Sequence, residues 1–343
     1  MLLLFLIIPV TVVAFVVSKP NKRRGLLMSS SSLECNDMTR ESIQGKNVIL
    51  TGASSGLGKF LAFQLAKCNV KTLVLSGRNM EQLESVKLKC EDMLSNDRSC
   101  IEIATCDLSD EVSVNDFSNK AMEICNETAD VLILCGGISS RSSFLETKHD
   151  VDKMLMQVNF LSGSAIAKRV VPSMVKNQSG NIIWISSVQG LFGTPYRTSY
   201  AASKFAVQGT SFVLICNFLT PCLLEAINLI IIIQSLGYCE ALRSELTSSG
   251  VNVSCVSPGY IKTNLSKGAI RGDGSKHGQM DETTAKGADP DEVAVEILDS
   301  AVGGKTDFVV AATFSAKAAM ILKFFAPSFL EKQLVKRFIK ASK

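Results

Sequence analysis

The sequence has few of the residues that build metal centres, disulfide frameworks or aromatic surfaces. Among its 343 residues there are two histidines, His149 and His277, and aromatic side chains make up 6% of the chain. The eleven cysteines are odd in number, and no two of them form a C-x-x-C pair. These shortages argue against a zinc site and a disulfide framework, so we expect no bound metal and mostly reduced, buried cysteines.

Net charge is also low outside the C-terminus. The chain has a net charge of +4, but residues 317–343 contain seven basic residues and one acidic residue, which leaves the remainder at −2. We therefore expect no nucleic-acid partner. A chain of this length with 46% hydrophobic residues suits a single α/β domain with appendages.

The N-terminus has no charged side chain across residues 1–18, and a basic cluster follows at residues 19–24. The apolar span is marginally short for a bilayer crossing of about 20 residues, and no small-residue cleavage site stands before the basic cluster. We expect an uncleaved signal anchor, with a cleaved signal peptide as the alternative. The positive-inside rule then places the basic and polar linker, residues 19–44, and the following domain on the cytosolic side of a membrane, expected to be the endoplasmic reticulum.

The C-terminal segment, residues 316–343, is predicted to end in a basic amphipathic helix. Apolar residues recur every four positions from Leu330 to Phe338, and lysines recur two positions out of phase from Lys332 to Lys340. The apolar stripe could lie in an anionic membrane surface or dock on its own domain, and the membrane surface is the favoured partner.

A short strand is predicted from Lys46 to Leu50, followed by a glycine-bearing turn and a helix. In such a turn the backbone can approach a pyrophosphate, which faces unpaired N–H groups at the start of the helix. The residues of this cradle are Thr51, Gly52, Ser54, Ser55, Gly56, Leu57 and Gly58. A purely structural turn rarely needs three glycines, so the segment predicts dinucleotide binding.

Three more strands are predicted at residues 72–76, 101–106 and 131–134, and helical segments at 79–95 and 111–126 alternate with them. Strands that alternate with helices form parallel sheets with right-handed crossovers. The predicted fold is therefore α/β, a single doubly wound, Rossmann-like domain with a parallel sheet.

Two charged residues at strand ends bear on the choice of dinucleotide. Arg78 follows the second strand, where an arginine accommodates the 2′-phosphate of NADP and a carboxylate would bind the ribose of NAD. We therefore predict NADP(H) rather than NAD(H), with a surface arginine at a helix start as the alternative. Asp107 follows the third strand and could close the adenine pocket or cap the next helix.

The segment from Gly180 to Gly209 carries the candidate catalytic groups. Its apolar run at residues 182–185 predicts a fully buried strand that delivers Ser187, and a helix follows in which Tyr200 and Lys204 lie one turn apart. A phenol ordinarily titrates near ~10, but a neighbouring positive charge favours the phenolate. Ser187 would supply a hydrogen bond to the substrate oxygen. A Tyr-x-x-x-Lys pair by itself is more often a solvated helix pair.

These motifs occur in the order and spacing found in short-chain dehydrogenases/reductases, which the chain resembles over roughly residues 44–266. The residues that carry the resemblance are Thr51, Gly52, Gly56, Gly58, Asp107, Ser187, Tyr200, Lys204, Pro258, Gly259 and Thr263. Within that superfamily, the run at 186–190 and the basic-ended layout resemble the membrane-associated dehydrogenase/reductase member 7 group. The resemblance implies a catalytic domain at residues 45–315 and a homodimer or homotetramer.

The resemblance also implies roles for individual residues. Tyr200 would be the acid–base residue and Ser187 the partner that polarises the oxygen. Lys204 would bind the nicotinamide ribose and lower the pKa of Tyr200, while Asn159 would hold the water through which protons reach Lys204. The segment from Pro258 through Gly259 to Thr263 would cover the nicotinamide end, and Cys135 and Gly136 would line the cofactor pocket.

The chain departs from the family pattern at Cys135, where such proteins carry an asparagine that ties neighbouring strands together. A looser cofactor pocket is expected as a result. A second departure is the apolar insert at residues 210–237, because its removal would join Gly209 to Tyr238 and continue one helix face. We interpret the insert as foreign, from a retained intron or a gene-model error. A second membrane span at 212–233 is rejected, since it would place the domain on both sides of the bilayer.

The sequence predicts an NADP(H)-dependent oxidoreductase that interconverts a secondary alcohol and a ketone or aldehyde. A small lipophilic substrate, such as a steroid, retinoid or lipid carbonyl, is expected because both chain ends favour membranes. A segment rich in Gly, Lys, Asp and Thr at residues 268–287 predicts a mobile flap that encloses the substrate, with His277 solvated within it. The alternative function is a membrane-tethered NADP-binding protein without turnover, which Cys135 and the insert support.

Overall fold

The computed structural model describes residues 33–95, 98–208 and 237–341. The predicted anchor at residues 1–18 and nearly all of the insert at 210–237 lie outside these ranges. Residues from Glu34 onward form one compact unit. Among the described residues, no helix combines the length and apolar character that a membrane crossing requires.

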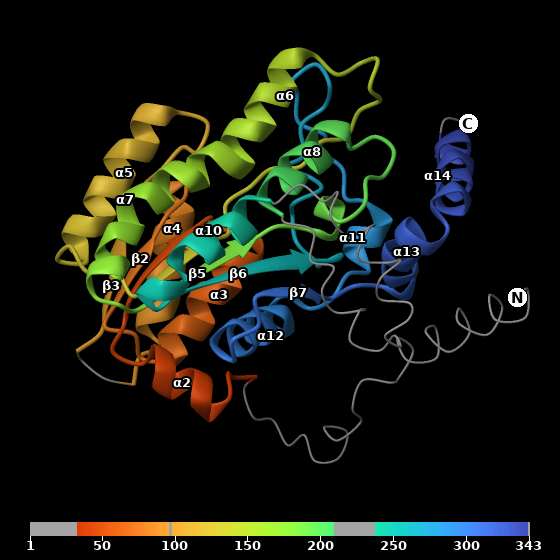
Figure 1. Ribbon diagram of the computed structural model, residues 1–343. Helices are drawn as coiled ribbons and strands as arrows, with labels where there is room; N and C mark the ends of the chain where they lie inside the picture. The colour runs from red at the N-terminus through yellow and green to blue at the C-terminus, as the bar shows by residue number, and fades with distance from the viewer. Residues whose placement is uncertain (1–32, 96–97, 209–236, 342–343) are drawn as a thin grey trace, which may run out of the picture. The chain divides into compact units, whose positions relative to one another are not determined.

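Within the described ranges, seven strands form one sheet in which each strand runs parallel to its neighbours, in the order β3-β2-β1-β4-β5-β6-β7 (Figure 1). The strands are β1 (Asn47–Thr51), β2 (Thr72–Leu75), β3 (Cys100–Ile103), β4 (Val131–Leu134), β5 (Gly180–Ile185), β6 (Val251–Pro258) and β7 (Asp307–Val310). The chain order reverses between β1 and β4, so the prediction of a doubly wound parallel sheet is confirmed.

Helices cover both faces of the sheet. The α-helices in the described ranges are α2 (Asp37–Ile43), α3 (Gly56–Lys67), α4 (Met80–Glu91), α5 (Glu111–Ile124), α6 (His149–Met156), α7 (Ser162–Lys176), α8 (Thr198–Val207), α10 (Tyr238–Leu246), α11 (Glu282–Ala285), α12 (Pro290–Val302), α13 (Phe314–Phe325) and α14 (Pro327–Ala341). Helices α5, α7 and α10 lie on one face, and α2, α3 and α12 lie on the other (Figure 1).

Trp184 anchors the central strand β5 in the core. Its side chain is 2% exposed, and its ring lies 5.3 Å from the ring of Tyr238 and 6.3 Å from that of Phe160. A Cβ added at Gly163 would lie 2.6 Å from the indole, so only glycine lets α7 approach the strand this closely. This packing fixes the carboxyl end of β5 and therefore the position of Ser187 that follows it.

The helical stretch from Asp150 to Lys176 is interrupted. A π-helical turn at Gln157–Leu161 separates α6 from α7. Such turns insert one extra residue into the helical repeat and occur frequently at functional sites. The apolar periodicity on both sides continues through the turn, so the sequence carries no signal of the interruption.

The segments that flank the insert occupy defined places in the core. Helix α8 ends at Val207, where Gln208 takes an extended conformation, and α10 begins at Tyr238. The phenol of Tyr238 lies 3.0 Å from the hydroxyl of Ser164, and Leu246 is buried against the sheet. The apolar residues of α10, which follows the insert in the sequence, are thus packed in the core, as predicted for the single helix that would form without the insert.

The apolar stripe predicted near the C-terminus turns toward the domain. In α14, Leu330 is 8% exposed, and the ring of Phe338 stacks on Tyr196 at 5.2 Å. Docking on its own domain, one of the two alternatives for this stripe, is therefore what the structure shows.

Candidate active site

A cavity of about 740 Å³ lies at the carboxyl ends of the strands, where ligands bind in open parallel sheets. Of the predicted site residues, all except Asn159 line it. They are Thr51, Gly52, Ser54, Ser55, Gly56, Leu57, Gly58, Arg78, Asp107, Cys135, Gly136, Ser187, Tyr200, Lys204, Pro258, Gly259 and Thr263. The structure therefore brings together in one cavity residues that are more than 200 positions apart.

The glycine turn after β1 approaches other backbone atoms so closely that a side chain would not fit at its glycines. A Cβ at Gly52 would lie 2.7 Å from Cα of Gly136, and a Cβ at Gly58 would lie 2.2 Å from the carbonyl oxygen of Gly52. Thr51 fixes the opposite wall, because its hydroxyl accepts hydrogen bonds from the N–H groups of Cys135 and Gly136 at 3.1 Å. The turn forms a narrow cradle whose surface is backbone.

The start of α3 faces the same cradle. Its N-cap residue, Ser55, is extended and makes no side-chain cap hydrogen bond, so the first N–H groups of the helix are left for a ligand. Gly56 has φ +55°, a conformation that favours glycine, and a Cβ there would lie 3.5 Å from Cβ of Thr263. Glycines, uncapped N–H groups and a wide cavity fit the pyrophosphate of a dinucleotide.

In the part of the cavity that follows β3, Asp107 is tied to its own turn. One carboxylate oxygen accepts hydrogen bonds from the N–H and the hydroxyl of Ser109, at 2.9 and 2.7 Å. Burial alone would raise the pKa of Asp107, but these hydrogen bonds and the charge of Arg78 lower it below its ordinary value of 3.8. The alternative that Asp107 caps the next helix is wrong, because Asp110 is the N-cap of α5.

Tyr200 and Lys204 lie on α8, and both are 5% exposed. The Lys204 Nζ lies 5.9 Å from the centre of the Tyr200 ring and donates a hydrogen bond to the carbonyl of Ile185 at 3.0 Å. A solvated surface pair, the alternative considered for these residues, does not fit this burial. The lysine is fixed between the end of β5 and the phenol.

Ser187 begins the short 3₁₀ turn Val188–Gly190, and its oxygen accepts a hydrogen bond from the N–H of Gln189 at 3.1 Å. This contact occupies a lone pair and leaves the hydroxyl hydrogen to point elsewhere. Ser187 and Tyr200 line the same cavity.

Asn159 lies behind the cavity wall, in the π-helical turn. Its Oδ1 accepts from the N–H of Ile138 at 2.8 Å, and its Nδ2 donates to the carbonyl of Ile138 at 2.9 Å and to Ser203 Oγ at 2.8 Å. A Cβ on Gly137 would come within 3.0 Å of Oδ1 and 3.5 Å of the Lys204 Nζ. Asn159 therefore approaches Lys204 across Gly137, and its role in proton transfer stays a prediction.

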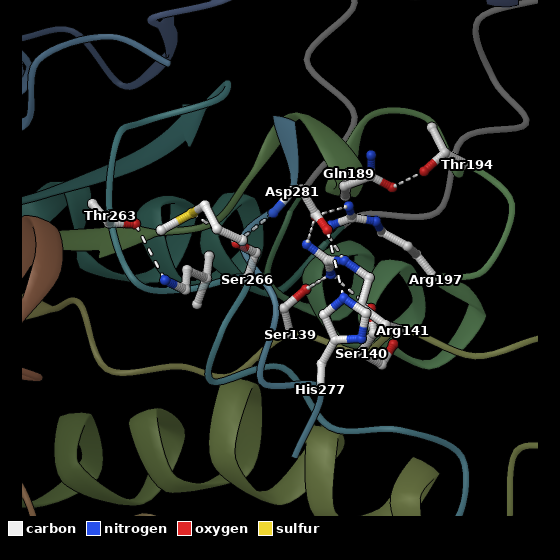
Figure 2. Close-up of polar contacts among 12 residues, drawn as sticks. Ser139, Ser140, Arg141, Gln189, Thr194, Arg197, Thr263, Ser266, His277 and Asp281 are labelled. Carbon is white, nitrogen blue, oxygen red and sulfur yellow. Dashed lines mark hydrogen bonds and ion pairs between the residues drawn. The ribbon is translucent and has the colours of Figure 1, made fainter. Parts of the chain in front are cut away.

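The cavity wall also contains a charged cluster that the sequence does not predict, and Figure 2 shows its contacts. Asp281 accepts hydrogen bonds from Arg141 Nε at 2.9 Å and from Arg197 Nη2 at 3.1 Å. Arg141 also donates to the hydroxyl of Ser139 and the carbonyl of Ser140, both at 2.7 Å. The arginines line the cavity, so the cluster ties the segments after β4, before α8 and within the flap.

One residue of the flap is more buried than predicted, although most residues from 271 to 279 are exposed. His277, expected to be solvated, has 19% of its side chain exposed and lies 3.7 Å from Asp281. Burial lowers its pKa, as do the charges of both arginines, against the opposing effect of Asp281. Burial and Arg141 lower the pKa of Arg197. The flap therefore carries a neutral imidazole and a carboxylate into a region of excess positive charge.

Comparison with known proteins identifies the family. The sequence profile of the family described as short chain dehydrogenase matches residues 46–218. The chain is 38% identical over 306 residues to the Drosophila melanogaster protein named Dehydrogenase/reductase SDR family protein 7-like, an alignment that covers 88% of this chain and 83% of the relative. This chain belongs to the short-chain dehydrogenase family.

Further similarities agree with this assignment. The chain is 35% identical over 288 residues to Dehydrogenase/reductase SDR family member 7B of Xenopus tropicalis, with 83% of each chain covered. A solved short chain dehydrogenase/reductase family protein shares the fold with a TM-score of 0.56 and 20% identity, covering 78% of this chain and 97% of that one. Within the family, the chain belongs with the family member 7-like group.

This short-chain dehydrogenase is therefore a member of an oxidoreductase family that binds nicotinamide cofactors. Its departure at Cys135 places a thiol on the cofactor wall. Burial raises the pKa of this thiol to about 12, although the charge of Lys204 acts to lower it. Cys135 is therefore a protonated, unreactive side chain at neutral pH.

Proposed function

We propose that this short-chain dehydrogenase is an NADP(H)-dependent oxidoreductase that interconverts a secondary alcohol and the matching ketone or aldehyde. The observation that carries the proposal is the burial of Tyr200 and Lys204 one turn apart on α8, with Ser187, in the cavity that also holds the glycine cradle. A phenol, a hydroxyl and a fixed ammonium beside a dinucleotide cradle suit reversible proton transfer to a carbonyl oxygen.

The bound nicotinamide would supply the hydride chemistry. In the reduction direction, Ser187 donates a hydrogen bond to the substrate oxygen, and Tyr200 donates its proton to the same atom as negative charge develops there. Lys204, held by the carbonyl of Ile185, presents its positive charge to the phenol and stabilises the phenolate that remains. In the oxidation direction, Tyr200 takes the proton back.

The preference for NADP(H) and for a lipophilic substrate is part of the proposal. Arg78 is exposed at the end of β2 and lines the cavity, where its guanidinium is available to a 2′-phosphate. Apolar side chains line the substrate end, among them Met154, Val158, Leu265 and Ile270. We also propose the endoplasmic reticulum membrane as the location, through the apolar N-terminal segment, and a homodimer or homotetramer as the assembly.

The substitution Tyr200→Phe tests the proposal. Removal of the proton donor should lower kcat by a factor of about 10²–10⁴, measured by NADPH oxidation with a panel of ketones and aldehydes. The affinity for NADPH should stay within about twofold, because the phenyl ring is retained. Tyr238→Phe is the matched control, because Tyr238 lies in the core and pairs with Ser164.

Two outcomes would contradict the proposal. Turnover that is equal in Tyr200→Phe and the wild type would remove Tyr200 from the chemistry. A wild-type protein that binds NADPH but turns over no carbonyl in the panel would favour a cofactor-binding protein without turnover, which the thiol of Cys135 on the cofactor wall supports.

A further inference from the structure

Helices α13 and α14 present an outer surface that mixes large apolar and basic side chains, here called the tail face. Its apolar members have exposed fractions from 38% to 57%, and its basic members are also exposed. The tail face consists of Phe324, Phe325, Phe329, Val335 and Ile339 with Lys332, Lys336 and Arg337. Surface phenylalanines in such a group usually mark a place where something binds.

The inner sides of the same helices are already occupied by the domain. Ala316 of α13 packs on Val188 and Phe192, next to Ser187. Lys323 donates a hydrogen bond to the carbonyl of Leu191 at 2.6 Å and lies 4.7 Å from the centre of the Phe205 ring. Together with the buried Leu330 of α14, these contacts fix the orientation of the helices, so the tail face is what remains outward.

The charge of this region selects the kind of partner. Between residues 317 and 343 there are seven basic residues and one acidic residue, Glu331. In α14 the exposed Phe329, Val335 and Ile339 are interleaved with lysines along one side of the helix. That arrangement suits a bilayer interface, where apolar side chains enter the acyl boundary and lysines reach lipid phosphates.

We propose that the tail face docks on an anionic lipid bilayer. Because α13 rests on the residues that follow Ser187, and Phe338 stacks on Tyr196 beside Arg197, docking places the mouth of the cavity at the membrane surface. A lipophilic substrate then reaches the cavity from the bilayer rather than from water. This docking is distinct from the N-terminal anchor and from catalysis, so its test does not depend on turnover.

Tryptophan fluorescence of the full-length chain in reconstituted vesicles tests the proposal. The natural protein has one tryptophan, the buried Trp184, which gives a constant background. The emission of the Phe329→Trp variant should shift to shorter wavelengths and be quenched by brominated lipids in vesicles of phosphatidylcholine with phosphatidylserine. Leu88→Trp on α4, at an exposed position away from the tail face, is the matched control and should show neither change.

Charge reversal provides the second arm of the test. Each lysine near an anionic surface contributes about a fivefold factor to binding. Lys332→Glu with Lys336→Glu, introduced into the Phe329→Trp variant, should therefore reduce the quenching at least several-fold. Lys168→Glu with Lys176→Glu, two exposed lysines of α7, should leave the quenching of that variant unchanged.

Three results would overturn the proposal. The first is equal quenching in the Leu88→Trp and Phe329→Trp variants, and the second is quenching that is insensitive to reversal of Lys332 and Lys336. The third is blue-shifted emission of the Phe329→Trp variant in detergent-free solution without vesicles, which would mean that protein covers the tail face. None of these results would bear on the oxidoreductase activity, which Tyr200→Phe tests separately.

Discussion

Asp281 balances the charges of Arg141 and Arg197 at the substrate end of the cavity. The two arginines have 11% and 13% of their side chains exposed, and Asp281 has 21%. Without the carboxylate, two like charges would remain partly buried next to each other, which is costlier than never having formed the pair. The carboxylate therefore bears on the stability of the fold as well as on the position of the flap.

The substitution Asp281→Asn should lower the free energy of unfolding by about 2–4 kcal/mol, because it leaves both guanidinium groups without their counter-ion. Urea unfolding at pH 7 measures this. Asp273→Asn, in the same flap but bonded only to Ser275 in its own turn, is the matched control and should leave the stability unchanged. Equal losses of unfolding free energy in the two variants would show that the charged cluster contributes no more to stability than the local contacts of Asp273 do.

The same pair of proteins has a defined pH dependence. Burial would raise the pKa of Asp281, but hydrogen bonds from Arg141 and the charges of both arginines lower it below its ordinary value of 3.8. A carboxylate with a lowered pKa stabilises the fold above its unfolded-state pKa, and this contribution is lost as the pH falls through the lowered value. The difference between wild type and Asp281→Asn should persist from pH 7 to about 4 and shrink below that.

Arg78 decides between the two cofactors if the proposed preference is right. Arg78→Gln should weaken NADPH binding by a factor of about 10–100, since a charge-assisted contact to a phosphate contributes about 1.5–3 kcal/mol. NADH, which has no 2′-phosphate, should bind the variant as it binds the wild type. Calorimetry with both cofactors gives the answer, and an equal loss for both would assign Arg78 a structural role.

The sequence predicts residues of the site that stand at strand ends within recognisable motifs. Thr51 and Ser187 are of this kind, because a parallel sheet brings all its carboxyl ends to one edge. Tyr200 and Lys204 are predicted instead from their one-turn spacing on the helix that follows β5. The charged cluster has no such signal, since Asp281 lies 140 residues from Arg141 and 84 from Arg197. Only tertiary packing of the flap brings these groups together.

At the scale of elements, strands buried on both faces were predictable and irregular turns were not. The runs that form β1, β2 and β4 are apolar throughout their centres, and all their residues are buried. The edge strand β7 was not predicted, because of its four residues only Val310 is buried. The π-helical turn was not predicted either, since the bonds that hold Asn159 run to Ile138 and Ser203 rather than along the helix.

Helices α8 and α10 flank the insert, and both are packed despite it. Gln208, the residue after α8, bonds the hydroxyls of Ser186 and Ser257, while α10 lies on the sheet. The insert of 28 residues lengthens the connection from β5 to β6 from about 37 to about 65 residues, which costs only about 0.5 kcal/mol in loop closure. Its apolar composition is the larger burden, through aggregation.

Deletion of residues 210–237 should therefore raise the free energy of unfolding by about 0.5 kcal/mol and reduce the aggregated fraction more clearly. Urea unfolding and size-exclusion chromatography measure the two effects. A variant in which a Gly/Ser segment of equal length replaces the insert separates the causes, because it keeps the loop length and removes the apolar side chains. If the deletion variant fails to fold, the interpretation of the insert as foreign is wrong.

At the scale of the whole molecule, β3 and β4 are consecutive in the sequence but are separated in the sheet by β2 and β1. β1 pairs with β2 on one side and with β4 on the other. The first half of the sheet, β1 to β3, therefore meets the second half, β4 to β7, at this pair, and the cavity forms where the two halves meet. The cofactor cradle belongs to the first half, and Ser187, Tyr200 and Lys204 belong to the second. Neither half alone contains a complete site.

This order has a consequence during protein synthesis. At about 5–20 residues per second, the ribosome needs about 4–16 s after finishing β1 before β4 emerges to cover its open side. The edge of β5 likewise stays unpaired until β6 has been synthesised, and the 28 residues of the insert lengthen this interval by about 1–6 s. During this interval the apolar edge of β5 is exposed in the nascent chain, which makes it a target for chaperones before the enzyme is complete.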